Sequence, residues 1–200
     1  MSARLISLSC NAEKTIGYCA RVSNSKNQDN PDVAGLLKFC IKHGHWSIFE
    51  MANMVIEINT NRGIAAQILR HRYAKAQGFE YIKPRRQDNK NRQNSFDDLS
   101  EDNKTWFEYT HQRIQESTNS FYEEALERGI AKETARFMLP LSTKTRMYMN
   151  GTVRSWIHYI ELRTDESTQK EHRDIADEIK GIFSKNLPVI ANALGWSKCS

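Results

Sequence analysis

The chain has 200 residues, of which 39% are hydrophobic and 26% are charged, so it is long enough to bury one hydrophobic core. No apolar run reaches the roughly 20 residues of a membrane-spanning helix. The N-terminus also lacks a signal-peptide stretch, and we therefore expect a cytoplasmic protein with no membrane partner. The net charge of +5 favours an anionic partner, either nucleic acid or a phosphorylated small molecule, or simply reflects a solvated surface.

The spacing of cysteine and histidine argues against a disulfide framework and against a metal site. The four cysteines show no CxxC spacing and no histidine at zinc-finger distance, which predicts reduced thiols at Cys10, Cys19, Cys40 and Cys199. His43 and His45 form an H-x-H pair, but no set of carboxylates or thiols accompanies them. We therefore expect no bound metal.

The first sixty residues predict two strands and two helices. Residues 5–8 have the composition of a short strand, and Asn11 is a candidate cap for the helix that follows. Pro31, after Asn30, is typical of the first turn of a helix. The helix that it begins should face the core through Val33, Leu36, Leu37, Cys40 and Ile41. A half-buried strand is predicted where apolar side chains alternate, at Met54, Ile56 and Ile58.

A third helix is predicted over residues 62–71, with Asn61 as its cap. Gln67, Arg70 and His71 stand at positions i, i+3 and i+4, so they share one polar side of this helix. Residues 85–98 are strongly polar and predict a loop.

The second half of the chain predicts mostly helix. Helices are expected over residues 101–128, 152–162 and 169–183, and a strand over residues 145–150. No repeat or linker divides the sequence. We therefore expect residues 1–200 to form a single α+β domain that is helix-rich, with a small and mostly antiparallel sheet.

Residues 45–50 place His45, Ser47 and Glu50 within six positions. A hydroxyl and a carboxylate at this spacing can orient a ligand. The same Ser-x-x-Glu spacing also forms a helix capping box. The sequence leaves both interpretations open.

Cationic residues recur in separate segments. Gln67 shares a helix face with Arg70, and the run Arg70-His71-Arg72 ends that helix, where the helix dipole also favours positive charge. Further cationic groups follow at Arg136, Arg154, His158 and Arg163. Because guanidinium forks bind phosphate and carboxylate oxygens, these groups predict a pocket for a multiply charged ligand. The alternative is a set of ordinary solvated side chains.

No catalytic nucleophile stands out in the sequence. It contains no G-x-S-x-G, P-loop, G-x-G-x-x-G or H-E-x-x-H motif. An enzyme with this sequence would rely on a bound cofactor for its difficult chemistry.

Five segments, in order along nearly the whole chain, carry a family resemblance: residues 45–50, 67–72, 135–140, 153–163 and 169–173. Together they resemble the flavin-dependent thymidylate synthases. The RHR triplet alone would be weak, whereas the ordered set, with Leu162-Arg163 closing the late helix, is specific. The polar run at residues 85–95 is similar to phage-encoded members, so we expect a phage origin.

The resemblance implies the thymidylate synthase-complementing type of fold and a homotetramer whose sites form between subunits. It also implies methylation of dUMP at C5 to dTMP, with FAD as cofactor, methylene-tetrahydrofolate as carbon donor and NADPH as reductant. The residues implied to bind FAD are Ser47, Glu50, Arg70, His71, Arg72, Arg154, His158 and Leu162. Those implied to bind dUMP are Gln67, Arg70, Arg72, Tyr73, Arg136 and Arg163. Arg163 is the expected catalytic group, which polarises the uracil ring.

The sequence departs from the family signature after Arg72. Counting onward places Glu80 and Ile82 where a serine and an arginine belong. In another register Arg72-Tyr73 ends the signature, and about ten residues that would include backbone amides around the dUMP phosphate are absent. Either the protein lacks this segment or the printed sequence omits it. Thr152 stands where the family usually has Asn beside the flavin.

Other functions remain open on the sequence. A degenerate family member would bind FAD or nucleotide without turnover, as the shortened signature suggests. A nucleic-acid-binding module would use the basic run at residues 85–92, but only Phe79 and Tyr81 lie near it for base stacking. We therefore expect no stable nucleic-acid partner. The sequence does not separate methyl from hydroxymethyl transfer.

Overall fold

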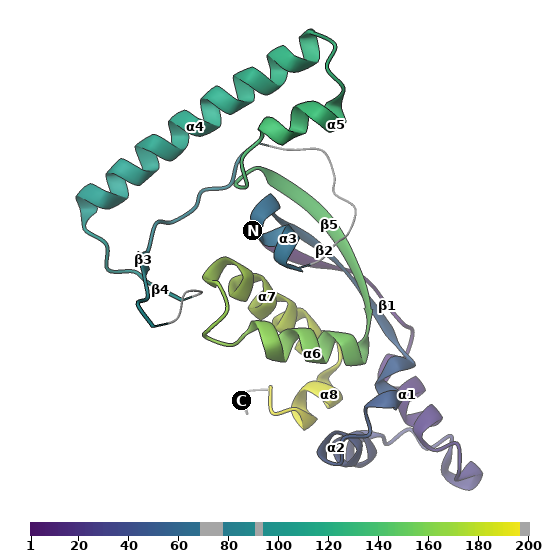
Figure 1. Cartoon of the computed structure of the whole chain (residues 1–200). Helices are drawn as coiled ribbons and strands as arrows, with labels where there is room; N and C mark the ends of the chain where they lie inside the picture. Colours follow the sequence, from purple (N-terminus) through teal and green to yellow (C-terminus); the bar gives the residue numbers. More distant parts are fainter. Residues whose placement is uncertain (69–77, 91–93, 197–200) are drawn as a thin grey trace. The chain divides into compact units, whose positions relative to one another are not determined.

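The computed structural model describes residues 1–68, 78–90 and 94–196 (Figure 1). The chain forms two compact units. Unit 1 consists of Met1, Asn59–Met147 and Glu166–His172, and unit 2 consists of Ser2–Ile58, Tyr148–Asp165 and the chain from Arg173 onward. The single domain over residues 1–200 stays a prediction.

The elements are, in chain order, β1 (Ser2–Leu8), α1 (Ala12–Ala20), η1 (Ser25–Asn27), α2 (Ala34–Lys42), η2 (Trp46–Glu50), β2 (Asn53–Asn61), α3 (Arg62–Ile68), β3 (Arg86–Gln87), β4 (Ser95–Phe96), α4 (Glu101–Glu127), α5 (Lys132–Ala135), η3 (Arg136–Met138), β5 (Lys144–Thr152), α6 (Val153–Arg163), α7 (Lys170–Asn186) and α8 (Pro188–Ala193). The η elements are short 3₁₀ turns. Each strand and helix predicted by its periodicity has a counterpart here, and the helix-rich α+β class is confirmed.

The main sheet is small and antiparallel, with strand order β1-β2-β5. Met54, Ile56 and Ile58 of β2 are fully buried. Along β5 the buried side chains alternate, at Thr145, Met147 and Met149. This period of two is what a strand with one face against the core requires.

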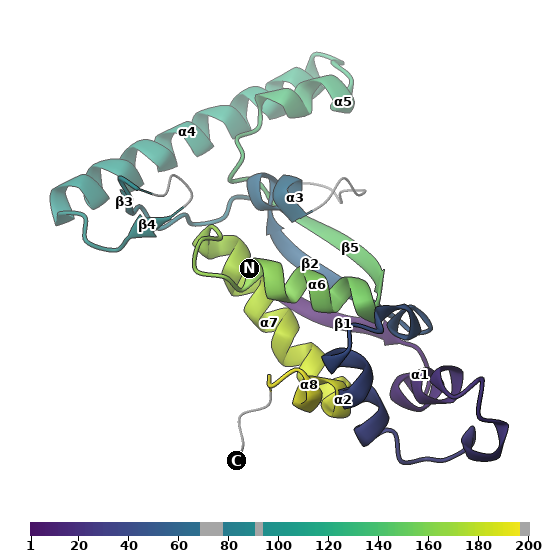
Figure 2. The same ribbon diagram turned by 60° about the horizontal axis from the view of Figure 1, so that its bottom comes forward.

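The core of unit 2 forms around α6. Trp156 is fully buried, and its ring N–H donates a hydrogen bond of 2.9 Å to the carbonyl of Met54. α6 and α1 both contact η2, and α2 contacts α8, which lies beside it in Figure 2. A buried tryptophan whose N–H is satisfied contributes both apolar area and a fixed orientation. α6 is therefore held firmly by its own chain.

The first turn of α8 receives its cap from another helix. Leu187 occupies the N-cap position but makes no side-chain cap bond. Instead the Glu13 carboxylate of α1 accepts a hydrogen bond of 2.9 Å from the backbone N–H of Ile190. Burial raises the pKa of Glu13, and this backbone contact opposes the shift.

The long helix α4 belongs to unit 1, where it contacts α5 and η3 (Figure 1). The Ser100 hydroxyl accepts a hydrogen bond from the backbone N–H of Asn103 and caps its first turn. Ala125 is its one buried residue. Gln115 donates a hydrogen bond of 3.3 Å to the Ser142 hydroxyl, which fastens the middle of α4 to the segment before β5.

Residues 78–80 lie directly against the start of β5. The Gly78 carbonyl accepts a hydrogen bond of 2.8 Å from the Lys144 N–H, and the Glu80 N–H donates one of 2.8 Å to the Ser142 carbonyl. Phe79 forms an antiparallel bridge with Thr143. Residues 78–80 are thus anchored to the segment around the start of β5.

The predicted helix start at Pro31 is wrong, because α2 begins at Ala34. The Arg21 guanidinium donates hydrogen bonds to the carbonyls of Asn30 and Asp32, at 2.6 and 2.5 Å. The Asn30 side chain also accepts a bond from the Asp32 N–H at 2.9 Å. These contacts hold the segment in a turn and delay the helix.

Two further local predictions fail. Asn11 occupies the N-cap position of α1, but its backbone is left-handed and its side chain makes no cap hydrogen bond. The predicted loop at residues 85–98 contains the antiparallel hairpin of β3 and β4, with Arg86 opposite Phe96. Across the parts of the chain that the structure describes, no helix combines the length and the apolar character needed to cross a membrane.

Candidate functional site

Ser47 and Glu50 lie on the exposed side of η2, in unit 2. Phe49 is fully buried and anchors this turn. The capping-box interpretation is wrong, because η2 begins after His45 rather than at Ser47, and His45 makes no side-chain cap bond. The side chains of Ser47 and Glu50 are thus presented outward by a turn whose position the core fixes.

An ion pair links two of the segments predicted to bind flavin. Arg154 Nη1 lies 2.5 Å from Glu50 Oε1, with 49% and 44% of the two side chains exposed. His158 is exposed one helical turn after Arg154, on the same face of α6. Because arginine has five N–H donors and an exposed ion pair is weak, Arg154 has donors left for a ligand anion.

Backbone contacts at its first turn orient α6. The Val153 N–H donates a hydrogen bond of 2.9 Å to the Ala52 carbonyl. The Thr152 hydroxyl accepts one of 3.2 Å from the Ser155 N–H, which is an N-cap interaction. Thr152, the position that departs from the family, therefore serves the helix. The direction in which Arg154 projects follows from these contacts.

The last turn of α6 carries Leu162 and Arg163. Leu162 is 51% exposed, and Arg163 is partly buried. Burial raises the pKa of Tyr159 well above its ordinary value, and the positive charge of Arg163 opposes this shift. The Tyr159 phenol is therefore neutral at physiological pH, and Arg163 is close enough for its charge to act on that phenol.

Gln67 lies on the exposed side of α3, in unit 1. The Asn61 side chain accepts a hydrogen bond of 2.9 Å from the Ile64 N–H, so the predicted cap is confirmed. Ile64, Ala65 and Ile68 face the core. The side-chain nitrogen Nε2 of Gln67 donates a hydrogen bond of 2.7 Å to Oε1 of Gln169.

Arg136 begins η3 and is exposed. The Arg62 guanidinium donates to the backbone carbonyls of Arg136 and Leu139, at 3.0 and 2.9 Å, and so fixes this turn. Among the described residues no partner is recorded for the Arg136 guanidinium, which leaves it available to an anion.

The predicted site residues divide between the two units. Unit 2 holds Ser47, Glu50, Arg154, His158, Leu162 and Arg163, and unit 1 holds Gln67 and Arg136. Four more, and the altered signature with them, lie outside the described residues: Arg70, His71, Arg72 and Tyr73. The structure brings Glu50 and Arg154 into direct contact.

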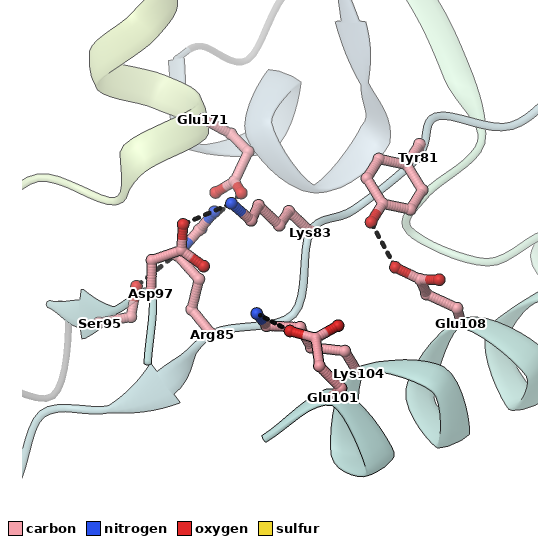
Figure 3. A network of polar contacts seen from close by, with 9 residues as sticks. All are labelled: Tyr81, Lys83, Arg85, Ser95, Asp97, Glu101, Lys104, Glu108 and Glu171. Carbon is pink, nitrogen blue, oxygen red and sulfur yellow. Dashed lines mark hydrogen bonds and ion pairs between the residues drawn. The ribbon is translucent and has the colours of Figure 1, made fainter. Parts of the chain in front are cut away.

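A polar network around β3 and β4 was not predicted from the sequence. Arg85 donates a hydrogen bond of 2.5 Å to Glu171 and one of 2.9 Å to Ser95 (Figure 3). Lys83 pairs with Asp97, and the hydrogen bond from Lys83 lowers the pKa of that carboxyl. The only sequence signals were the acidic residues beyond the basic run and the Gln-x-Glu at residues 169–171.

Carboxylates thus neutralise the first two cations of the basic run, Arg85 and Arg86. Arg86 forms an ion pair of 2.7 Å with Asp98, which holds the pKa of that carboxyl below its ordinary value. Each of these cations already has a partner within unit 1. The network therefore disfavours the nucleic-acid-binding interpretation, which needs free positive charge.

Comparisons with known proteins identify relatives over almost the whole chain. The family described as thymidylate synthase complementing protein matches residues 4–189. A flavin-dependent thymidylate synthase of Synechocystis sp. is 54% identical over 194 residues, covering 92% of this chain and 90% of the relative. A probable flavin-dependent thymidylate synthase of Paramecium bursaria Chlorella virus 1 is 51% identical over 215 residues, covering 98% of this chain and 100% of the relative.

A solved structure shares the fold. A UMP/dUMP methylase of Streptomyces cacaoi, crystallised with 5-Br UMP, aligns with a TM-score of 0.81 at 24% identity, covering 96% of this chain and 92% of that one. Both alignments with sequence relatives are longer than the part of this chain that they cover. They therefore contain positions that this chain lacks.

Proposed function

Because the chain belongs to the family of thymidylate synthase complementing proteins, we propose that it methylates dUMP at C5 to form dTMP. The family match covers residues 4–189, and two relatives above 50% identity bear the name flavin-dependent thymidylate synthase. FAD is the cofactor, and methylene-tetrahydrofolate donates the carbon. NADPH is the reductant that the resemblance implies.

The contact between Glu50 and Arg154 carries the flavin assignment. It joins two distant segments of the sequence into one exposed polar surface, on which His158 also lies. FAD contains a diphosphate, and a guanidinium with unused donors beside an imidazole suits that anion. Glu50 orients Arg154, the Ser47 hydroxyl adds a donor, and the exposed Leu162 offers apolar contact. FAD, when bound, supplies the redox chemistry that no side chain of the protein provides.

The residues that the resemblance implies for dUMP form the proposed nucleotide site. Arg136, whose guanidinium has no recorded partner among the described residues, suits the phosphate of dUMP. Gln67 supplies amide hydrogen bonds, and Arg163 stabilises negative charge that develops on the uracil ring. Arg70, Arg72 and Tyr73 complete this proposed set.

The proposed assembly is a homotetramer with sites between subunits, in the cytoplasm of the cell or of a phage's host. Large apolar side chains of unit 1 support it by their exposure, which reaches 66% at Trp106, 57% at Phe121 and 80% at Phe137. Exposed apolar surface of this kind marks sites of protein association. One relative is viral, which supports a viral origin, and the phage origin remains part of the proposal.

A degenerate protein that binds FAD or nucleotide without turnover is the second candidate. The observation that favours it is the altered signature after Arg72, together with alignments that contain positions absent from this chain. Such a protein would keep the contact between Glu50 and Arg154 and would lose part of the phosphate site.

The first test is the visible absorption spectrum of the purified protein, with and without added FAD and dUMP. It is followed by release of tritium from dUMP labelled at C5, in the presence of NADPH and the folate. We expect a bound-flavin spectrum that changes with dUMP, and tritium release. Flavin binding without tritium release would establish the degenerate protein. No flavin binding at all would refute the proposed function.

Arg154→Met tests the carrying observation, with Arg128→Met as its matched control. Arg128 also forms an exposed ion pair of 2.5 Å, with Glu124, on a helix not assigned to the site. Loss of one charge-assisted hydrogen bond should weaken FAD binding roughly tenfold or more in Arg154→Met. The control should bind FAD like the wild type. Equal FAD affinity in the two variants would remove Arg154 from the flavin site.

A further inference from the structure

A chain of side-chain hydrogen bonds in unit 1 begins at Gln67. Gln67 Nε2 donates to Gln169 Oε1 at 2.7 Å, and Gln169 Nε2 donates to Glu171 Oε2 at 3.0 Å. Glu171 Oε1 in turn accepts from Arg85 Nη2 at 2.5 Å. Gln67 is thus joined through Gln169 to the ion pair of Glu171 and Arg85, which Figure 3 shows from close by.

The charge of Glu171 sets the direction of every bond in this chain. An ionised carboxylate can only accept hydrogen bonds, and an amide has one accepting and one donating end. Gln169 must therefore turn its NH₂ group toward Glu171 and its oxygen toward Gln67. Gln67 must then turn its own NH₂ group toward Gln169. The accepting oxygen of Gln67 is left for another group, and no partner for it is recorded among the described residues.

The ion pair of Arg85 and Glu171 fixes one end of this series of hydrogen bonds. Only 11% of the Arg85 side chain and 9% of the Glu171 side chain are exposed. Arg85 is also fixed by its Nε, which donates a bond of 2.9 Å to the Ser95 hydroxyl in β4. Removing one partner of a buried pair leaves the other charge unpaired, so such pairs resist rearrangement.

We propose that Gln169, Glu171 and Arg85 are positioning residues that hold the Gln67 amide with its oxygen toward the nucleotide, where it accepts a hydrogen bond from a hydroxyl or ring N–H group. This inference rests on the proposed function, in which Gln67 binds dUMP. It adds one requirement: the nucleotide group that contacts Gln67 must be a hydrogen-bond donor. The buried negative charge of Glu171 imposes this requirement through Gln169.

Glu171→Gln reverses this direction while keeping the shape of the side chain. Because Arg85 can only donate, it holds the new amide by its oxygen, and the new NH₂ group then faces Gln169. Gln169 turns over, and so does Gln67, which now offers its NH₂ group to the nucleotide. We expect the affinity for dUMP to fall roughly two- to tenfold, the effect of one hydrogen bond.

Two analogues separate this effect from a general weakening of the site. 3′-Deoxy-dUMP lacks the sugar hydroxyl, and N3-methyl-dUMP lacks the ring N–H. The wild type should bind one of them more weakly than dUMP, because a donor to Gln67 is gone. In Glu171→Gln the difference in affinity between dUMP and that analogue should become smaller. A merely structural disturbance would not change this difference. Calorimetric titration of each nucleotide measures this.

Gln169→Met and Asp97→Asn complete the set. Gln169→Met keeps the ion pair of Arg85 and Glu171 but leaves the Gln67 amide free to take either direction. Its affinity for dUMP should therefore lie between that of the wild type and that of Glu171→Gln. Asp97→Asn removes the ion pair with Lys83 beside the same hairpin and should bind dUMP like the wild type. If Glu171→Gln does not fold, as judged by its melting curve, Gln169→Met decides the question.

The outcomes are distinct from those that test the proposed function. A wild-type protein that does not bind dUMP refutes the proposed function. A wild type that binds dUMP while the folded variants of Glu171 and Gln169 keep its affinity and its preference among the analogues refutes only the positioning role. A wild type that binds both analogues as well as it binds dUMP also overturns the positioning role.

Discussion

The two helices α6 and α4 differ in how much of their surface is buried. α6 has eleven residues, and five of them are buried: Val153, Trp156, Ile157, Tyr159 and Ile160. α4 has 27 residues, of which Ala125 is buried, and its exposed side chains include Trp106 and Phe121. The chain itself covers one apolar face of α6, whereas large apolar side chains of α4 remain exposed.

This difference suggests different roles for the two helices: α6 positions candidate site residues, and α4 offers a surface for association with another chain. A candidate site residue such as Arg154 needs a fixed base, and the buried face of α6 provides it. A long helix that exposes aromatic side chains gains its apolar burial only when another surface covers it. Substitutions in α6 should therefore act on stability and on the site, and substitutions in α4 should act on assembly.

The largest effect is expected from Trp156→Ala. It removes a fully buried side chain and its hydrogen bond to the Met54 carbonyl, which should lower the free energy of unfolding by about 3–5 kcal/mol. Urea titration followed by circular dichroism measures this. Tyr18→Ala, at a position 48% exposed, should change stability by less than about 0.5 kcal/mol. Similar losses in both variants would contradict the central role of α6.

The second effect concerns α4. Replacing both Trp106 and Phe121 with Lys should reduce the molar mass in solution from that of an oligomer to that of a smaller species, because charges then occupy the exposed apolar face. Light scattering after gel filtration measures the mass. Glu116→Lys, also exposed on α4, is the control and should leave the mass unchanged. An unaltered mass in the double variant would mean that α4 does not mediate association.

A smaller effect is expected at the first turn of α6. Thr152→Ala removes the acceptor for the Ser155 N–H and should cost about 1 kcal/mol of stability. Thr152→Asn, the residue usual in the family, keeps a cap and should stay close to the wild type. Thermal unfolding of the three proteins gives the comparison. Equal losses in both variants would show that the hydroxyl of Thr152 does more than cap the helix.

The smallest effect is a dependence on pH at Glu13. Its folded-state pKa is raised above the ordinary value of 4.5 by burial. Glu13 therefore contributes most to stability in its protonated form, below that value, and this contribution is lost as pH rises through the raised pKa. Glu13→Gln cannot ionise, so its stability relative to the wild type should increase with pH across this window. A difference that stays constant with pH would exclude this origin.

Patterns in the sequence correctly predicted those elements that depend on residues close together in the chain. The alternation in β5, the apolar stripe of α7 and the buried face of α6 all depend on residues within a few positions, and each is present in the structure. Asn61 was also identified correctly as the cap of α3, because its partner Ile64 is three residues away. Periodicity and capping chemistry are sufficient for such elements.

The late start of α2 and the unpredicted hairpin depend on contacts that a periodic pattern does not reveal. The start of α2 is displaced by Arg21, nine and eleven residues from the carbonyls it binds. The hairpin at residues 86–96 depends on pairings across a polar segment that has no apolar period. Of the site, most candidate residues were recognisable from their spacing and charge, and their roles came from the family resemblance. The contact of Glu50 with Arg154 spans 104 positions and that of Gln67 with Gln169 spans 102, beyond any local pattern.

The anchoring of Gly78 to β5 has a consequence for changes in the length of the chain that precedes it. On one side of residues 69–77 the chain is held by the buried Ile68 of α3, and on the other by the hydrogen bond between the Gly78 carbonyl and Lys144. When both ends of a connection are fixed, doubling its length costs only about 0.6 kcal/mol of closure entropy. A longer or shorter stretch between these two anchors should therefore leave the surrounding architecture intact.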